Sequence, residues 1–134
     1  MSLEIEPRER EGIHILELNG RITMGEEVTA FRQKLRDLAQ IADAKVILNM
    51  QRIDYVDSTG LGAIVMGSSA VRATGGIIKL VNLNRRNVEL LVATKLATIF
   101  EIFNDEQDAV NSFFPGREIK GFDILEFVKM QKQD

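Results

Sequence analysis

A pair of hydroxyl side chains near the middle of the chain stands between a strand-like run and a helix-like run. The string is Asp57-Ser58-Thr59-Gly60-Leu61-Gly62. The first turn of a helix has backbone N–H groups without internal partners and the positive end of the helix dipole, and both favour added negative charge. A phosphate on Ser58 would therefore be well placed. The alternative is helix capping, in which Ser58 or Thr59 accepts those N–H groups and the glycines permit close backbone approach.

Other patterns that carry catalysis are largely missing from the sequence. His14 is the only histidine and lies in a strand-like pattern, so the fold would have to bring it to Ser58 to complete a Ser-His-acid triad. The chain has no cysteine, no HExxH-like spacing, no GxGxxG and no GxxxxGK[ST]. Asp54 and Asp57 lie in an expected loop, where solvated carboxylates are the simpler interpretation than an acid-base pair. We expect no catalytic residue, no metal and no cofactor.

The composition indicates a single folded domain. With 134 residues, 45% of them hydrophobic and 28% charged, the chain can bury one core but not two sizeable ones. The net charge of −3 and the scattered Lys and Arg residues predict no nucleic-acid partner. The N-terminus has no signal-peptide pattern, and no apolar run approaches the ~20 residues that span a bilayer. We expect a cytoplasmic protein with no membrane span.

Strand-like and helix-like patterns alternate along the chain. Their order is β-β-α-β-α-β-α-β-α, which predicts a mostly parallel sheet in which only the first hairpin is antiparallel. Asn104, with Gln107 three residues later, resembles a capping box at the start of the last helix. The expected strands are 3–6, 13–18, 45–50, 77–83 and 99–103, and the expected helices are 26–41, the segment from Gly60 to a C-cap at Gly75-Gly76, 88–96, and 104–113.

The chain continues beyond this pattern. Pro115-Gly116 interrupts the alternation, and 122–128 is a further apolar segment before a polar end. We expect a domain over 1–114 and a C-terminal extension over 115–134 that forms an extra helix or an edge strand. Its apolar residues would pack on the domain, on a dimer partner or on another protein.

The extended pattern around the hydroxyl pair resembles the STAS family, whose best-known members are anti-sigma factor antagonists. The resemblance covers roughly residues 3–114. Its segments are Val46-Ile47-Leu48, then Ile53-Asp54-Tyr55-Val56 leading into the hydroxyl string, Gly75-Gly76 before Ile78-Lys79-Leu80-Val81, and the run from Ile99 to Val110.

The resemblance implies an α/β fold of the SpoIIAA-like type, with a four- or five-stranded, mostly parallel mixed sheet and about four helices packed on one side. It also implies a non-enzymatic bacterial regulator that is a monomer or a weak dimer. Ser58 would be phosphorylated by an anti-sigma factor serine/threonine kinase, which binds the ATP, with Thr59 as the second candidate. The unmodified protein would bind that kinase and set a sigma factor free, phosphorylation would end the binding, and a phosphatase would restore it. The implied partner surface is Thr23, Asp57, Ser58, Thr59, Gly60, Leu61 and Gly62.

Two positions depart from the family's pattern. Thr23, in Gly20-Arg21-Ile22-Thr23, stands where many antagonists have an aspartate, and Asn49 stands where the preceding strand commonly ends in one. We expect both to flank the kinase-binding surface. Two alternatives stay open: an interaction subunit of another signalling or lipid-transport assembly, and a small enzyme with Ser58 as its nucleophile, for which the sequence shows no base.

Overall fold

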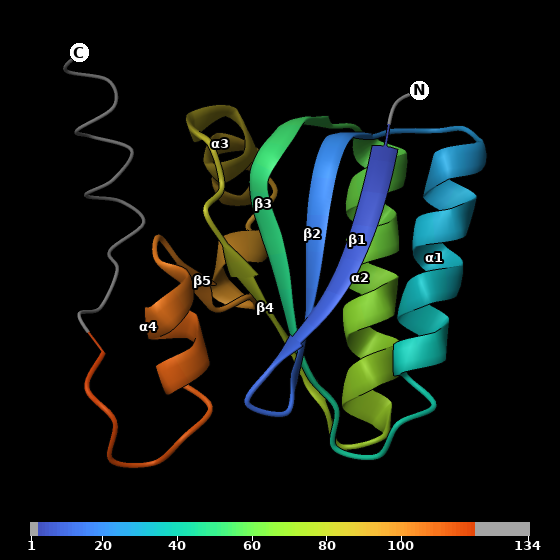
Figure 1. The fold of residues 1–134 in the computed structure, drawn as a ribbon. Coiled ribbons are helices and arrows are strands. Elements are labelled where there is room, and N and C mark those ends of the chain that lie inside the picture. The colour runs from blue at the N-terminus through green and yellow to red at the C-terminus, as the bar shows by residue number, and fades with distance from the viewer. Residues whose placement is uncertain (1–2, 120–134) are drawn as a thin grey trace, which may run out of the picture.

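A computed structural model describes residues 3–119 of the chain and follows the expected alternation of strands and helices (Figure 1). A short 3-10 helix, η1 (Leu96–Thr98), precedes the last strand. The elements are β1 (Leu3–Arg10), β2 (Ile13–Ile22), α1 (Glu26–Leu38), β3 (Lys45–Val56), α2 (Ser58–Ala73), β4 (Ile77–Val81), α3 (Arg85–Ala93), β5 (Ile102–Phe103) and α4 (Glu106–Asn111).

The five strands form one sheet in the order β1-β2-β3-β4-β5. β1 pairs antiparallel with β2, and the other three pairings are parallel. The predicted antiparallel hairpin and the predicted mostly parallel sheet are both confirmed. In the β2–β3 pairing, Ile22 lies opposite Val56, so these two strands end side by side at the same edge of the sheet.

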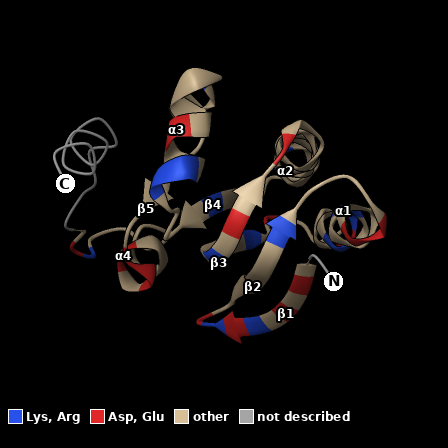
Figure 2. Cartoon of the chain, turned by 90° about the horizontal axis from the view of Figure 1, so that it is seen from above, with Lys and Arg blue, Asp and Glu red and all other residues tan. Residues whose placement is uncertain are grey.

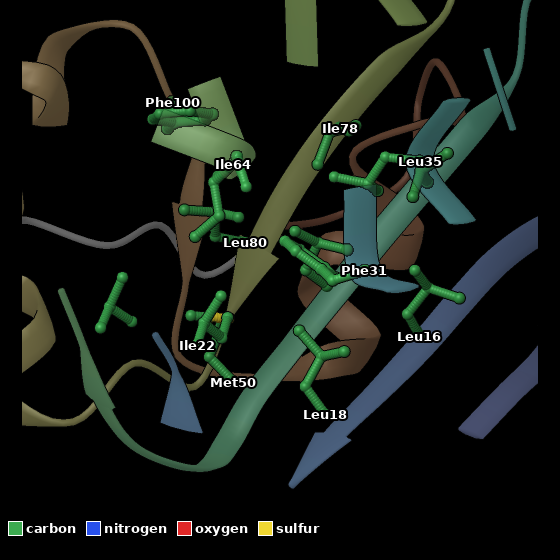
Figure 3. Close-up of a cluster of buried hydrophobic side chains, with 14 of the residues drawn as sticks. Leu16, Leu18, Ile22, Phe31, Leu35, Met50, Ile64, Ile78, Leu80 and Phe100 are labelled. Carbon is green, nitrogen blue, oxygen red and sulfur yellow. The ribbon is translucent and has the colours of Figure 1, made fainter. Parts of the chain in front are cut away.

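The larger core lies on the face of the sheet that α1, α2 and α3 cover. Side chains alternate between the two faces of a strand, so residues of one parity share this core where the strands are regular. In β3 the parity changes after Met50 and again after Ile53, where the β2–β3 register shifts. Figure 3 shows Phe31 and Leu35 of α1 and Ile64 of α2 over the sheet residues of this cluster. The sheet contributes Leu16, Leu18, Ile22, Val46, Leu48, Met50, Ile53, Val56, Ile78 and Leu80.

The fourth helix packs on the opposite face. Ile15, Ile47 and Val81 of the sheet meet Ala109 and Val110 of α4 in a second, smaller core. Figure 2 shows α1, α2 and α3 on one side of the sheet and α4 on the other. The predicted fold class is confirmed, but the expectation that all helices pack on one side is wrong for α4. The reason is that β2, β3 and β4 have apolar residues on both faces, so each face has to be covered.

The helices α1 and α2 pack closely against each other. Val28, Phe31, Leu35 and Leu38 form the buried stripe of α1, at the three- and four-residue spacing that the sequence shows. Gly67 of α2 lies where a Cβ atom would collide with the Leu35 side chain. The missing side chain therefore sets the short separation of the two helices.

Several expected boundaries differ from the observed ones. β3 continues to Val56 because Ile53 and Val56 are buried while β2 still pairs alongside, so 51–56 is strand and not loop. The last strand shrinks from 99–103 to Ile102–Phe103 because η1 takes up the chain before it. The predicted end of α2 at Gly75-Gly76 is confirmed, but the C-cap itself is Thr74, one residue earlier. Gly75 follows it at φ 88°, and the N–H groups of both glycines bond back to the last turn of α2.

The expected cap of α4 is wrong by one residue. Asp105, and not Asn104, precedes the first helical residue, and its carboxylate accepts from the Asp108 N–H at 3.1 Å. Asn104 is one residue too far from the helix to make this contact. Gln107 bonds to Arg10 and Asn111 instead of closing a capping box. The apolar segment expected over 122–128 lies outside the described residues.

Candidate functional site

The paired ends of β2 and β3 bring together two segments that are far apart in the sequence. The backbone N–H of Asp57 donates to the Ile22 carbonyl at 3.2 Å, which continues the β2–β3 pairing into the start of α2. Thr23 and Met24 follow directly after Ile22, so the loop before α1 lies beside the hydroxyl string. In open α/β sheets, binding sites form at such carboxyl ends of parallel strands.

Asp57 is the N-cap of α2. It has an extended backbone (φ −90°, ψ −177°), and its Oδ1 accepts from the Gly60 N–H at 2.8 Å. Its other oxygen, Oδ2, accepts from the Met24 N–H at 3.0 Å. Two expectations are therefore wrong: Asp57 is not a solvated loop carboxylate, and neither Ser58 nor Thr59 caps the helix. The cap position has to stand just outside the helix, and both hydroxyl residues are already inside it.

The contacts of Asp57 also keep it ionised. The Gly60 N–H lowers the pKa of this carboxyl most, and the N–H groups of Met24 and Thr59 lower it further, against a smaller opposing effect of burial. Hydrogen bonds donated to a carboxylate favour its charged form. Asp57 is therefore an anion at neutral pH, directly before Ser58.

Ser58 is the first residue of α2, and it is exposed. Because Asp57 caps the helix, the hydroxyl of Ser58 is not needed for that purpose. The first turn of this 16-residue helix contains no acidic residue that would compete for the positive end of the dipole. Thr59 is half-buried and therefore less accessible than Ser58.

The other residues of the predicted surface divide into two groups. Gly60 and Leu61 are buried, and a Cβ atom on Gly60 would collide with the Ile22 carbonyl, so the fold itself requires this glycine. Gly62 and Thr23 are half-buried, and a Cβ atom on Gly62 would have no atom within 4 Å. Ser58, Thr59, Gly62 and Thr23 can therefore reach a partner, whereas Gly60 and Leu61 shape the site from within.

An open groove of about 390 Å³ runs from Ser58 toward α3. Tyr55 and Leu90 line it, together with Arg86, whose guanidinium lies 5.7 Å from the centre of the Tyr55 ring. Met24 stands beside the site and is 77% exposed, and Tyr55 is 41% exposed. Both are among the large apolar side chains that residues 3–119 expose.

Sequence reasoning missed Met24, Tyr55 and Arg86 as parts of this surface. Tyr55 belongs to the motif that carries the family resemblance, and the other two lie in different segments that the parallel strands bring to the same edge. Asn49 is not at the site: it lies in the middle of β3 with a buried side chain that bonds to Glu17 at 3.2 Å. Asn49 precedes Asp57 by eight positions, which corresponds to roughly 26 Å along an extended strand.

Within residues 3–119, no group of three His, Cys, Asp or Glu side chains is placed to hold a metal ion. Among the same residues, no helix combines the length and the apolar character that crossing a membrane requires.

Comparison with known families decides the wider class of the protein. The family model described as the STAS domain matches residues 4–109, which include every strand and helix of the sheet domain up to the middle of α4. The chain belongs to the STAS family.

Relatives of this chain are named as anti-sigma factor antagonists. The chain is 33% identical over 103 residues to the anti-sigma-B factor antagonist of Bacillus subtilis, and the match covers 76% of this chain and 92% of that protein. A candidate anti-sigma factor antagonist from Thermotoga maritima has the same fold, with a TM-score of 0.75 and 23% identity over 81% of this chain and 92% of that one. The phosphorylated form of SpoIIAA from Bacillus matches with a TM-score of 0.63 and 19% identity, over 84% of this chain and 99% of that one.

Membership of this family agrees with the expected SpoIIAA-like fold. Anti-sigma factor antagonists are regulators without enzymatic activity, in agreement with the expectation of a non-enzymatic protein. The enzyme alternative with Ser58 as a nucleophile is therefore not needed to account for the exposed serine.

Replacing Asp57 by alanine should lower the free energy of unfolding by about 1–2 kcal/mol at neutral pH, because the helix loses its cap and the Met24 N–H loses its acceptor. Urea denaturation followed by circular dichroism measures this change. A carboxylate with a lowered pKa stabilises the fold fully above the ordinary Asp value of about 4, and the effect is lost as pH falls through the lowered value. The difference between the two proteins should therefore shrink in acid.

The matched control is Asp54→Ala, which removes an exposed carboxylate whose contact with Arg21 is 3.9 Å long. We expect it to change stability by less than about 0.5 kcal/mol. A difference between wild type and the Asp57 variant that stays constant down to about pH 3 would contradict the assigned role of the carboxylate.

Proposed function

We propose that this protein is an anti-sigma factor antagonist that binds an anti-sigma serine kinase while Ser58 is unmodified and loses that binding when the kinase phosphorylates Ser58. Binding sets the sigma factor free, and a phosphatase restores the binding form. The observation that carries the proposal is that the first helical residue of α2 and the residue that caps this helix are different residues. Asp57 caps the helix, which leaves Ser58 exposed at the helix terminus and not needed as the cap.

The relatives support this proposal. The Bacillus subtilis protein is named as an antagonist of the anti-sigma-B factor, and SpoIIAA has been solved in a phosphorylated form. In this chain, the hydroxyl residue directly after the motif aspartate is Ser58. Its exposure exceeds that of Thr59, which makes it the better acceptor.

The electrostatics at Ser58 would make phosphorylation act on binding and not on folding. A phosphate adds about −1.5 to −2 charges at neutral pH, and the N-terminus of a helix tolerates added negative charge well. The same charge would stand next to the ionised Asp57 at the centre of the partner surface. Burying it against a partner without matching cations costs several kcal/mol, and about 3 kcal/mol already weakens an equilibrium more than a hundredfold.

Gly62 gives independent support for a close partner. A glycine inside a helix destabilises it by about 1 kcal/mol relative to alanine. At Gly60 and Gly67, neighbouring residues leave no space for a side chain, but the position of a Cβ atom on Gly62 is open. Nothing within residues 3–119 accounts for the glycine, whereas close approach of a partner backbone one turn after Ser58 would.

Incubation with ATP and the anti-sigma serine kinase encoded nearest to this gene should place one phosphate on Ser58, mapped by mass spectrometry. Ser58→Ala should abolish the modification, and Thr59→Ala should keep it. Phosphate on neither residue, or its persistence in Ser58→Ala, would contradict the proposed switch for that kinase.

Ser58→Asp should weaken binding to the same kinase by about tenfold or more, because it introduces a negative charge into the interface. The melting temperature should stay the same or rise slightly, since a carboxylate in the first turn of a helix is favourable. Isothermal titration calorimetry and thermal denaturation measure the two effects. Ser69→Asp, on an exposed position of the same helix, is the control and should leave the affinity unchanged. Equal affinities of the wild type and Ser58→Asp would argue against a switch at the interface.

Gly62→Ala should separate stability from binding. We expect the free energy of unfolding to rise by up to about 1 kcal/mol, because alanine is the better helix former and its Cβ meets no atom of the protein. Binding to the kinase should become weaker at the same time. Gly67→Ala is the contrasting control: its Cβ would collide with Leu35, so it should lower stability. Unchanged affinity in Gly62→Ala would remove Gly62 from the interface.

A further inference from the structure

A second groove, of about 230 Å³, lies between α1 and α2 and away from Ser58. Its floor is made of small residues of α2, namely Ala63, Gly67 and Ala70. Met66 stands at its rim and is 68% exposed. On the α1 side, Arg32 and Arg36 line the groove. The close packing of the two helices at Gly67 keeps this floor flat and free of large side chains.

The two arginines have no acidic partner in the part of the chain that the structure describes. The ion pairs of residues 3–119 do not include Arg32 or Arg36, and Arg36 donates a single hydrogen bond, to the side-chain oxygen of Gln33 at 3.3 Å. The Nε–H of Arg32 is buried without a hydrogen-bond acceptor. Like charges four residues apart on a helix repel each other. The helix dipole accounts for Arg36 in the last turn of α1, but not for Arg32 in its middle.

The chemistry of the groove selects one kind of occupant. Small residues on the floor and a flexible methionine at the rim suit the apolar face of an amphipathic helix. Unneutralised guanidinium groups along one side suit carboxylates on that helix. A second copy of this chain fits poorly, because a two-fold interface would place the arginines of one groove against those of the other. An anionic membrane also fits poorly, because membrane surfaces are recognised by clusters of about four to eight cations.

We infer that the groove formed by Arg32, Arg36, Ala63, Met66, Gly67 and Ala70 binds an acidic amphipathic helix of another protein. This docking surface is additional to the proposed switch at Ser58 and does not depend on the modification of that residue. It would allow a partner to hold the protein in both states of the switch.

Nuclear magnetic resonance of the full-length ¹⁵N-labelled protein tests the inference. The probe is a synthetic peptide of about four helical turns, with leucine along one face and glutamate on both flanks. We expect it to shift the amide signals of α1 and α2 around the groove. The double variant Arg32→Glu/Arg36→Glu should weaken its binding by about tenfold or more. Arg72→Glu, which changes an exposed cation on α2 that does not line the groove, should leave the affinity within about twofold.

Two further measurements decide between the occupants. A peptide with glutamine in place of every glutamate should bind at least about tenfold more weakly, and equal binding would overturn the acidic partner. Co-sedimentation with phosphatidylcholine–phosphatidylglycerol vesicles should be negative, and binding to the vesicles but not to the peptide would overturn a protein partner. Absence of signal changes at the groove with the acidic peptide would also overturn the inference.

The Ser58→Asp variant separates this inference from the proposed function. We expect this variant to bind the acidic peptide with the same affinity as the wild type. This expectation holds whether or not the kinase is found to phosphorylate Ser58 in the wild-type protein. Loss of peptide binding in this variant would show that the groove belongs to the switch surface, and would overturn the independence of the second site.

Discussion

The site depends on one carboxylate that bonds to two separate segments of the chain. Asp57 accepts one N–H from the first turn of α2 and one from the loop that follows β2, while its own N–H bonds to the last carbonyl of β2. These contacts hold the β2–α1 loop against the helix start. They also satisfy the helix terminus without using a hydroxyl group, because a charged oxygen takes the position that a serine would otherwise take. The exposure of Ser58 follows from this arrangement.

The three glycines Gly60, Gly62 and Gly67 of α2 differ in what surrounds them. Gly60 and Gly67 are required by neighbouring atoms and bring α2 close to β2 and α1. No atom of the described part of the chain requires a glycine at Gly62, which lies between Ser58 and Met66 on the helix. One helix therefore connects the proposed switch at its N-terminus with the groove beside α1. The two surfaces differ in charge: the first is centred on an anion, and the second is bordered by two cations.

The course of the chain could largely be predicted from the sequence because each element has its own local signal. The apolar stripe of α1 has helical spacing, the run at Val46–Met50 has apolar residues of both parities, and Gly75 marks a helix end with a left-handed backbone. Capping was less predictable. Serine, threonine, asparagine and aspartate all cap helices well, so neighbouring candidates differ only in where the first helical residue falls. That one-residue uncertainty misplaced the caps at both Asp57 and Asp105.

What the sequence by itself determined is the mostly parallel α/β fold, the STAS pattern and the position of Ser58 at a helix start, since these depend on local periodicity and on a contiguous string of residues. Only the tertiary structure decided which residue caps α2, that α4 covers the second face, that Asn49 lies far from the site, and that Met24, Tyr55 and Arg86 stand near Ser58. The physical reason is that strand pairing joins residues distant in the chain. Ile22 lies opposite Val56 because β2 and β3 are parallel neighbours, and no local pattern specifies that register.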